Sequence, residues 1–152
     1  MISRCNIHIR KHVFDYLENR FGLSSDLFTG LELYDCGNGR ISLGSQINLD
    51  RPTMVSSGIL IARIDAGIKP TSNLFHYFGY LVNRNIVNLD RESSLLFLKG
   101  EDMDITDSQT DSTSDGYVLV RYGEFNLGCA FIKGRRLRNQ LPKSKQLNVK
   151  FL

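Results

Sequence analysis

The last part of the chain carries cationic side chains whose spacing would suit phosphate binding. Residues 121–152 hold eight Lys and Arg residues and one Glu, although the formal net charge of the whole 152-residue protein is only +3. Such asymmetry is typical of proteins with an anionic partner, because Lys and Arg contact phosphate oxygens. A solvated tail without any partner is the alternative interpretation.

The candidate phosphate-binding side chains lie where the chain leaves a predicted hairpin. They are Lys133, Arg135, Arg136, Arg138, Lys143 and Lys145. Asn139 could hydrogen-bond to a base edge or a sugar hydroxyl, or it could be a turn residue that stabilises its own backbone, and both interpretations stay open. Lys69 lies beside a predicted helix start at Thr71, where backbone N–H groups would reinforce a phosphate contact, and Arg84 is a further candidate.

Patterns typical of a catalytic or metal site are scarce. His8 and His12 are spaced to share one helix face, but no third metal ligand has a recognisable spacing. The G-x-G at Gly37–Gly39 leads into a predicted strand rather than a helix, so it does not form a cofactor-binding loop. We therefore expect a protein that is not an enzyme and that uses no metal and no cofactor.

Composition places the chain among ordinary globular proteins. Hydrophobic residues make up 41% of it, which is enough to bury a core. No apolar run approaches the roughly 20 residues of a membrane span, and the start MISRCNIHIRKH has charges where a signal peptide has its hydrophobic region. We therefore expect a cytoplasmic protein without membrane association. Reduced thiols are the expectation for its three cysteines, Cys5, Cys36 and Cys129.

The elements that would position these side chains follow from hydrophobic spacing and glycine positions. IRKHVFDYLENRFG predicts an amphipathic helix that ends at Gly22, and the strands LELYDC and RISLG flank a hairpin turn at Gly37–Gly39. The segment INLDRPTMVSS is polar and contains Pro52, so we expect a domain boundary in residues 50–57. The predicted domains are a small α/β segment, residues 1–57, and a second domain, residues 58–152.

The second domain is predicted to be an α+β barrel. Its strands are expected at residues 58–64, 85–89, 116–122 and 126–132, with helices in NLFHYFGY and RESSLLFLKG. Residues 101–115 hold six carboxylates and little to bury, so a flexible acidic loop is expected there. A calcium loop is the alternative, but its central glycine and final glutamate are missing.

Four motifs resemble a known family by their order and spacing. They are Gly67-x-Lys69-Pro70-Thr71, Gly100-Glu101-Asp102, Gly116-Tyr117-Val118-Leu119-Val120 and Leu137-x-Asn139-x-x-Pro142-Lys143. From about Gly58 to Lys143 the chain resembles the PUA-like RNA-binding domain of RsmF and Nop2/Sun-type rRNA cytosine-C5 methyltransferases. Ala130 and Arg138 stand where that family often has Gly and Lys, which bears on the contact chemistry more than on the fold.

The resemblance implies a PUA-like, mostly antiparallel barrel with packed helices that holds structured rRNA or tRNA. The expected role is non-catalytic RNA binding in RNA modification or ribosome assembly, since the catalytic Pro-Cys and the S-adenosylmethionine loop of the methyltransferases have no counterpart in these residues. A methyltransferase or ribosome-assembly protein is a second expected partner. The alternative function is a protein-interaction adaptor in such a complex, with the acidic residues 101–115 engaging a basic partner.

Overall fold

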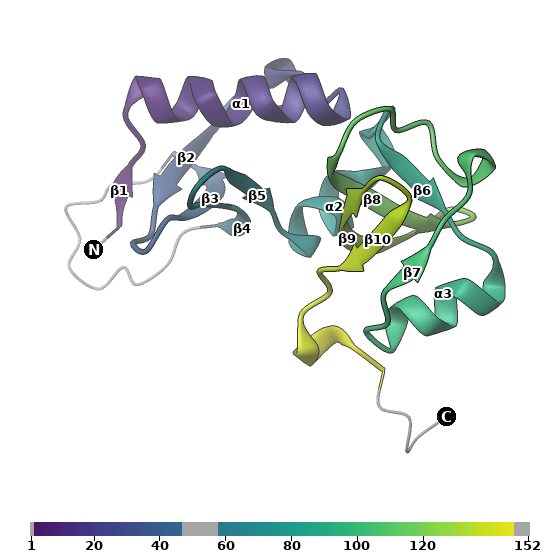
Figure 1. The fold of residues 1–152 in the computed structure, drawn as a ribbon. Helices are drawn as coiled ribbons and strands as arrows, with labels where there is room; N and C mark the ends of the chain where they lie inside the picture. Colours follow the sequence, from purple (N-terminus) through teal and green to yellow (C-terminus); the bar gives the residue numbers. More distant parts are fainter. Residues whose placement is uncertain (1, 47–57, 148–152) are drawn as a thin grey trace. The chain divides into compact units, whose positions relative to one another are not determined.

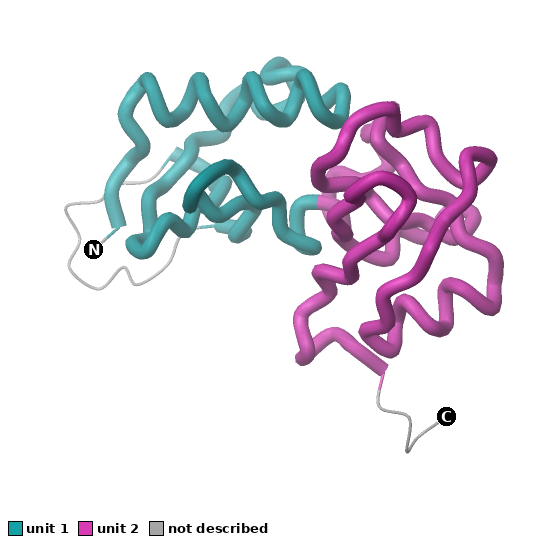
Figure 2. Tube along the Cα trace, viewed as in Figure 1, with its two compact units in different colours: residues 1–74 teal, residues 75–152 magenta. Residues whose placement is uncertain are grey.

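A computed structural model describes residues 2–46 and 58–147. The chain divides into two compact units, unit 1 with residues 1–74 and unit 2 with residues 75–152 (Figure 2). The boundary expected in residues 50–57 lies outside the described residues. The domain ranges 1–57 and 58–152 therefore stay a prediction, and the two units are described separately.

In unit 1, the predicted N-terminal helix is confirmed as α1, Ile7–Phe21. The Asn6 side chain accepts a hydrogen bond from the backbone N–H of Ile9 at 2.9 Å, and Gly22 ends the helix with a φ of 75°. The apolar face of α1 is buried, and α1 lies across the sheet of unit 1 (Figure 1). A short 3-10 helix, η1 (Ser25–Phe28), follows it.

The sheet of unit 1 is antiparallel throughout, in the order β1-β2-β3-β4-β5. Its strands are β1 (Ser3–Arg4), β2 (Leu31–Asp35), β3 (Arg40–Ser45), β4 (Ile59–Ile64) and β5 (Ile68–Pro70). The predicted hairpin turn between β2 and β3 is confirmed, with positive φ at Gly37, Asn38 and Gly39. The assignment of residues 58–64 to the barrel is wrong, because β4 pairs with β3 and buries its apolar side chains in unit 1.

The sheet of unit 2 curls into a half-barrel with the strand order β6-β8-β9-β10-β7. The strands are β6 (Ile86–Asn88), β7 (Met103–Asp104), β8 (Gly116–Tyr122), β9 (Phe125–Lys133) and β10 (Arg136–Asn139). β6 pairs with β8 in parallel, and the other pairs are antiparallel. The predicted α+β class, with a mostly antiparallel barrel-like sheet and a preceding α/β segment, is confirmed.

One helix of unit 2 packs against this curled sheet. α2 (Ser72–Phe78) runs into a 3-10 turn, η2 (Gly79–Leu81), and α3 is formed by Arg91–Leu98. The Asp90 carboxylate accepts a hydrogen bond from the Ser93 backbone N–H at 2.7 Å and so caps α3. Phe97 of α3 is fully buried against the sheet, in a core with these residues: Val87, Leu89, Ile105, Val118, Val120, Ala130, Ile132, Leu137 and Leu141.

The acidic segment, residues 101–115, contains two short regular elements, and the flexibility expected for it stays a prediction. It forms β7 and a 3-10 turn, η3 (Asp107–Gln109). Ile105 is only 4% exposed, and its backbone N–H donates to the Arg135 carbonyl at 2.9 Å. The segment was expected to have little to bury, but Ile105 joins the core and Asp102 and Asp107 accept hydrogen bonds from residues elsewhere in the unit.

The helices of residues 2–46 and 58–147 are all too short or too polar to cross a lipid bilayer.

Candidate nucleic-acid interface

The turn between β9 and β10 presents the basic residues on the outside of the half-barrel. β9 ends at Lys133, the turn passes through Gly134 with a φ of 61°, and Arg136 pairs opposite Lys133 at the start of β10. Side chains alternate along β10, so Leu137 is fully buried while Arg136 and Arg138 lie exposed on the other face. The strand geometry therefore places two guanidinium groups on one outer surface.

An aromatic pair lies in register with one of these arginines. Across three adjacent strands, Tyr117 of β8 pairs with Phe131 of β9, and Phe131 pairs with Arg138 of β10. The Tyr117 and Phe131 rings meet edge to face, with centroids 5.0 Å apart and planes at 83°. Both rings are half-buried. Aromatic rings beside cationic side chains are the combination that single-stranded nucleic acids require, because bases stack and phosphates pair with charge. We call Tyr117, Phe131, Lys133 and Arg138 the outer row.

The acidic segment supplies counter-charges to part of the basic turn. Arg135 Nε donates to Asp107 Oδ1 at 2.6 Å, and Arg136 Nη1 donates to Asp104 Oδ1 at 3.3 Å. All four side chains are well exposed, so water and salt screen these pairs and each contributes at most about 1 kcal/mol. Within the described residues, Lys133 and Arg138 have no such ion pair.

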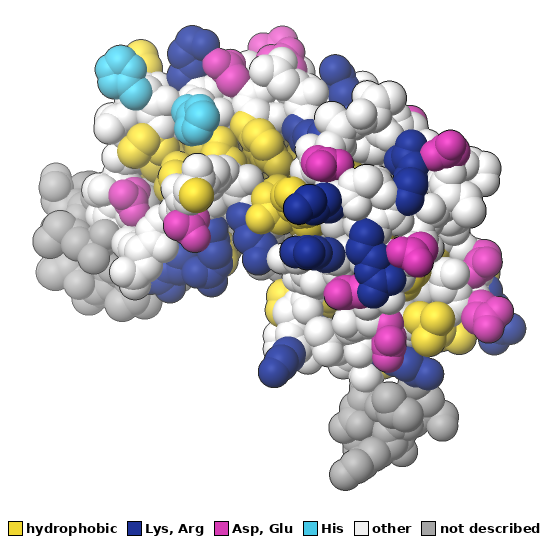
Figure 3. Space-filling view, viewed as in Figure 1, with side chains coloured by type: hydrophobic (Ala, Val, Ile, Leu, Met, Phe, Trp, Pro, Cys, Tyr) yellow, Lys and Arg dark blue, Asp and Glu magenta, His cyan; other side chains and the backbone are white. Residues whose placement is uncertain are grey.

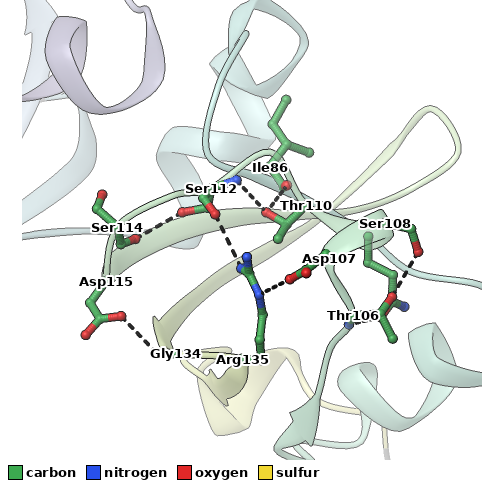
Figure 4. A network of polar contacts seen from close by, with 11 residues as sticks. Ile86, Thr106, Asp107, Ser108, Thr110, Ser112, Ser114, Asp115, Gly134 and Arg135 are labelled. Atoms are coloured by element: carbon green, nitrogen blue, oxygen red, sulfur yellow. Dashed lines mark hydrogen bonds and ion pairs between the residues drawn. The ribbon is translucent and has the colours of Figure 1, made fainter.

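Hydroxyl and backbone groups continue this network behind Arg135 (Figure 4). Arg135 Nη1 donates to the Ser112 carbonyl at 3.3 Å, and the buried Ser112 hydroxyl donates to the Ser114 carbonyl at 3.0 Å. Asp115 accepts a hydrogen bond from the Gly134 backbone N–H at 2.8 Å. A small open hollow of about 220 Å³ lies between these groups. The contacts fix the backbone of the β9–β10 turn to the end of the acidic segment.

Asn139 is held by the protein itself. Its Nδ2 donates to the carbonyls of Phe97 and Glu101, at 2.7 and 3.1 Å, and its Oδ1 accepts from the Leu141 N–H at 2.8 Å. Its own backbone N–H donates to Asp102 Oδ1 at 2.8 Å. Because both amide hydrogens are used, this geometry favours the interpretation as a turn residue, and reading of a base edge stays a prediction.

The remaining predicted site residues lie on other segments than the outer row. Lys143 and Lys145 are exposed on a 3-10 turn, η4 (Lys143–Lys145), beyond the end of β10. Arg84 is exposed and precedes Asn85, whose carbonyl accepts from the Leu119 N–H at 3.0 Å. The structure thus brings together Lys133, Arg135, Arg136 and Arg138.

Lys69 belongs to unit 1, where it lies on β5. Thr71 caps the start of α2 as expected, since its Oγ1 accepts from the Leu74 N–H at 3.3 Å. α2 has only seven residues, however, and a helix that short offers a weak dipole for a phosphate. Lys69 is instead paired across the sheet with Arg63.

The sequence interpretation missed the aromatic members of the outer row. Tyr117 and Phe131 were expected only as parts of strands, although their alternation with the buried Val118 and Ile132 places them on the opposite face. This alternation was the signal in the sequence that could have placed the two rings on the outer face. The register between β8 and β9, which brings the two rings together, has no local signal.

The curled sheet, its packed helix and the basic outer turn all lie in the part of the chain that a known family model matches. Residues 84–144 match the family model described as the methyltransferase RsmF PUA domain. The match contains all five strands of the sheet of unit 2. Residues 58–83, which the resemblance included, lie outside it. No curated protein matches the chain.

Proposed function

We propose that the protein binds structured RNA through the outer row and the adjoining basic turn of its PUA domain. PUA domains are typically RNA-binding, which supports the class of ligand. The observation that carries the proposal is the register of Tyr117, Phe131 and Arg138 on one outer surface, with Lys133 at the end of the same strand as Phe131. The outer row thus combines aromatic and cationic side chains, and its Lys133 and Arg138 form no ion pair with a carboxylate of the described residues.

In this proposal the two kinds of side chain have different tasks. Lys133 and Arg138 pair with backbone phosphates, which positions the RNA without reading its sequence. The aromatic edge of Tyr117 and Phe131 contacts an unpaired base. Arg135 and Arg136 join when RNA phosphates displace Asp107 and Asp104, since exposed ion pairs exchange at little cost.

We further propose that the described residues hold RNA and do not catalyse a reaction on it. The RNA would be an rRNA or tRNA, and a methyltransferase or ribosome-assembly protein would supply any chemistry. The three free cysteines fit a reducing compartment such as the cytoplasm. The adaptor alternative has less support, because three of the carboxylates that would engage a basic protein accept hydrogen bonds from backbone N–H groups of unit 2: Asp102, Asp111 and Asp115.

The test is fluorescence anisotropy with a labelled RNA stem–loop that has single-stranded flanks, measured at several salt concentrations. The double variant Lys133→Gln/Arg138→Gln should weaken binding, and the slope of log K against log salt should flatten by about 0.7 for each single-strand phosphate that the variant no longer neutralises. Arg91→Gln is the control for the loss of one positive charge elsewhere in the unit, because this exposed residue lies on α3 at the core side of the sheet. A folded double variant with unchanged affinity and slope would remove the outer row from the interface and favour the adaptor.

A further inference from the structure

Unit 1 has a basic surface of its own on its sheet. Arg40 of β3 lies directly opposite Arg63 of β4, and Arg63 lies directly opposite Lys69 of β5. Paired positions point to the same face, and neighbouring strands are about 4.8 Å apart, so the three side chains form a line about 10 Å long. We call these three residues the basic row. Figure 3 shows Lys and Arg side chains gathered on this unit.

The backbone holds Arg40 and Arg63, at one end of the basic row, in fixed positions. Ile64 N–H donates to the Gly39 carbonyl at 2.7 Å, which locks the start of β3 against the end of β4. A Cβ on Gly39 would meet the Ile64 carbonyl oxygen at 2.1 Å, and the φ of Gly39 is 74°, so a side chain is excluded there. Arg40 and Arg63 are therefore held opposite each other by the backbone.

The Arg40 guanidinium is also oriented before any ligand arrives. Its Nε donates to the Gly37 carbonyl at 3.1 Å and its Nη2 donates to the Cys36 carbonyl at 2.8 Å. The Nη1 group has no hydrogen bond of this kind to the described residues. A guanidinium group that is hydrogen-bonded on one side and has free N–H groups on the other is suited to bind phosphate oxygens.

The basic row lacks counter-charges within the part of the chain that the structure describes. Ion pairs there involve other residues, and none reaches Arg40, Arg63 or Lys69. The carboxylate of Asp35, near the turn, accepts from the Gly37 N–H at 2.8 Å. Like charges directly opposite each other destabilise a sheet, so three in line without a carboxylate point to an anionic ligand.

We propose that Arg40, Arg63 and Lys69 form a second RNA contact that binds phosphates of the sugar–phosphate backbone. The inference rests on the proposed function, because it assigns the basic row to the same RNA. The line carries cations but no exposed aromatic neighbour in its register, so it would position RNA without sequence preference, whereas the outer row also contacts a base. An acidic protein segment is the competing ligand that the test must separate.

The experiment compares the double variant Arg63→Gln/Lys69→Gln with the charge-preserving exchange Arg63→Lys/Lys69→Arg, using the labelled stem–loop. The first should bind several-fold more weakly and should flatten the salt slope by about 0.7 for each phosphate that it fails to neutralise, while the exchange should retain the wild-type slope. Arg40 is left unchanged, because its guanidinium also stabilises the hairpin turn. Combination with Lys133→Gln/Arg138→Gln should multiply the two reductions in affinity.

Each outcome has a distinct meaning. A wild-type protein that does not bind RNA overturns the proposed function and this inference together. Wild-type binding with unchanged affinity and slope in the folded Arg63→Gln/Lys69→Gln variant overturns this inference alone. Polyglutamate that displaces the RNA as well as unlabelled RNA does would make the basic row a general anion surface and refute its assignment to RNA. If the variant misfolds, RNA titration of the isotope-labelled wild type decides, since the amide signals of Arg63 and Lys69 should shift.

Discussion

Asp107 and Arg135 are 28 residues apart in the sequence, yet Asp107 Oδ1 and Arg135 Nε lie 2.6 Å from each other. This pair and the pair between Asp104 and Arg136 join the most acidic segment of the chain to its most basic one. The charge asymmetry along the sequence is therefore partly balanced in space. Any RNA that approaches the β9–β10 turn meets carboxylates as well as guanidinium groups.

Removal of these carboxylates should strengthen RNA binding. In Asp104→Asn/Asp107→Asn, Arg135 and Arg136 lose their competitors and nearby negative charges disappear, so we expect affinity about two- to fivefold higher at low salt. The gain should vanish at high salt because of screening. Anisotropy with the same stem–loop measures it, and Glu92→Gln on α3 is the control for the loss of one carboxylate elsewhere in the unit. Unchanged or weaker binding at low salt would show that the two arginines do not reach the RNA.

Asn139→Ala should lower stability rather than change RNA preference. The variant leaves the carbonyls of Phe97 and Glu101 and the N–H of Leu141 without the amide that now satisfies them. We expect a decrease of about 1–3 kcal/mol in the free energy of unfolding. Urea denaturation followed by circular dichroism measures this decrease. A variant of wild-type stability with an altered ranking of RNA sequences would instead assign Asn139 to base reading.

Cys5 should react slowly with alkylating agents. Burial raises the pKa of the Cys5 thiol to about 11 from the ordinary value of 9.0, and the nearby Asp35 adds to the effect. Because the thiolate is the nucleophile, its rate near neutral pH should be about 100-fold below that of a thiol with the ordinary value, and it should rise until the pH passes 11. Iodoacetamide labelling followed by mass spectrometry tests this against glutathione. Equal rates at pH 8 would contradict it.

The cap of α3 should make stability depend on acid pH. The backbone N–H of Ser93 holds the pKa of the Asp90 carboxyl below its ordinary value of 3.8. A lowered pKa in the folded state stabilises the protein above the ordinary pKa, and this stabilisation is lost as pH falls through the lowered value. As the solution is acidified, the melting temperature of the wild type should therefore fall relative to that of Asp90→Asn, whose amide caps without titrating. Parallel pH profiles of the two proteins would refute this role.

Local patterns predicted the elements best where glycines and apolar spacing coincide. The hairpin of β8 and β9 and the end of α1 at Gly22 have such signals, and the structure confirms both. β10 was not predicted, because Leu137 is its one buried apolar residue and flanking arginines conceal the period of two. The assignment of β4 to the first sheet depends on its pairing with β3, a choice of partner that no residue of β4 encodes alone.

The candidate site, like the fold, could be predicted only in part from the sequence. The cationic residues near the β9–β10 turn were evident from composition, whereas their counter-charges Asp104 and Asp107 come from a segment about 30 residues earlier in the sequence. Of the basic row only Lys69 was a candidate from the sequence. Arg40 and Arg63 were missed, because their alignment with Lys69 needs the register of three strands. The register between strands is set by tertiary structure. Local spacing in the sequence therefore predicts neither the counter-charges of the basic turn nor the alignment of the basic row.

The strand order of unit 2 also constrains how the protein is made. β7 precedes β8 and β9 in the chain but pairs with β10, so its edge of the half-barrel stays incomplete until residues 136–139 have left the ribosome. A nascent chain that ends before Arg135 leaves β9 with an open edge and Asp104 and Asp107 without their arginines. Open edges invite pairing with other chains, so stalled or truncated products should aggregate even though most of the sheet has already been synthesised.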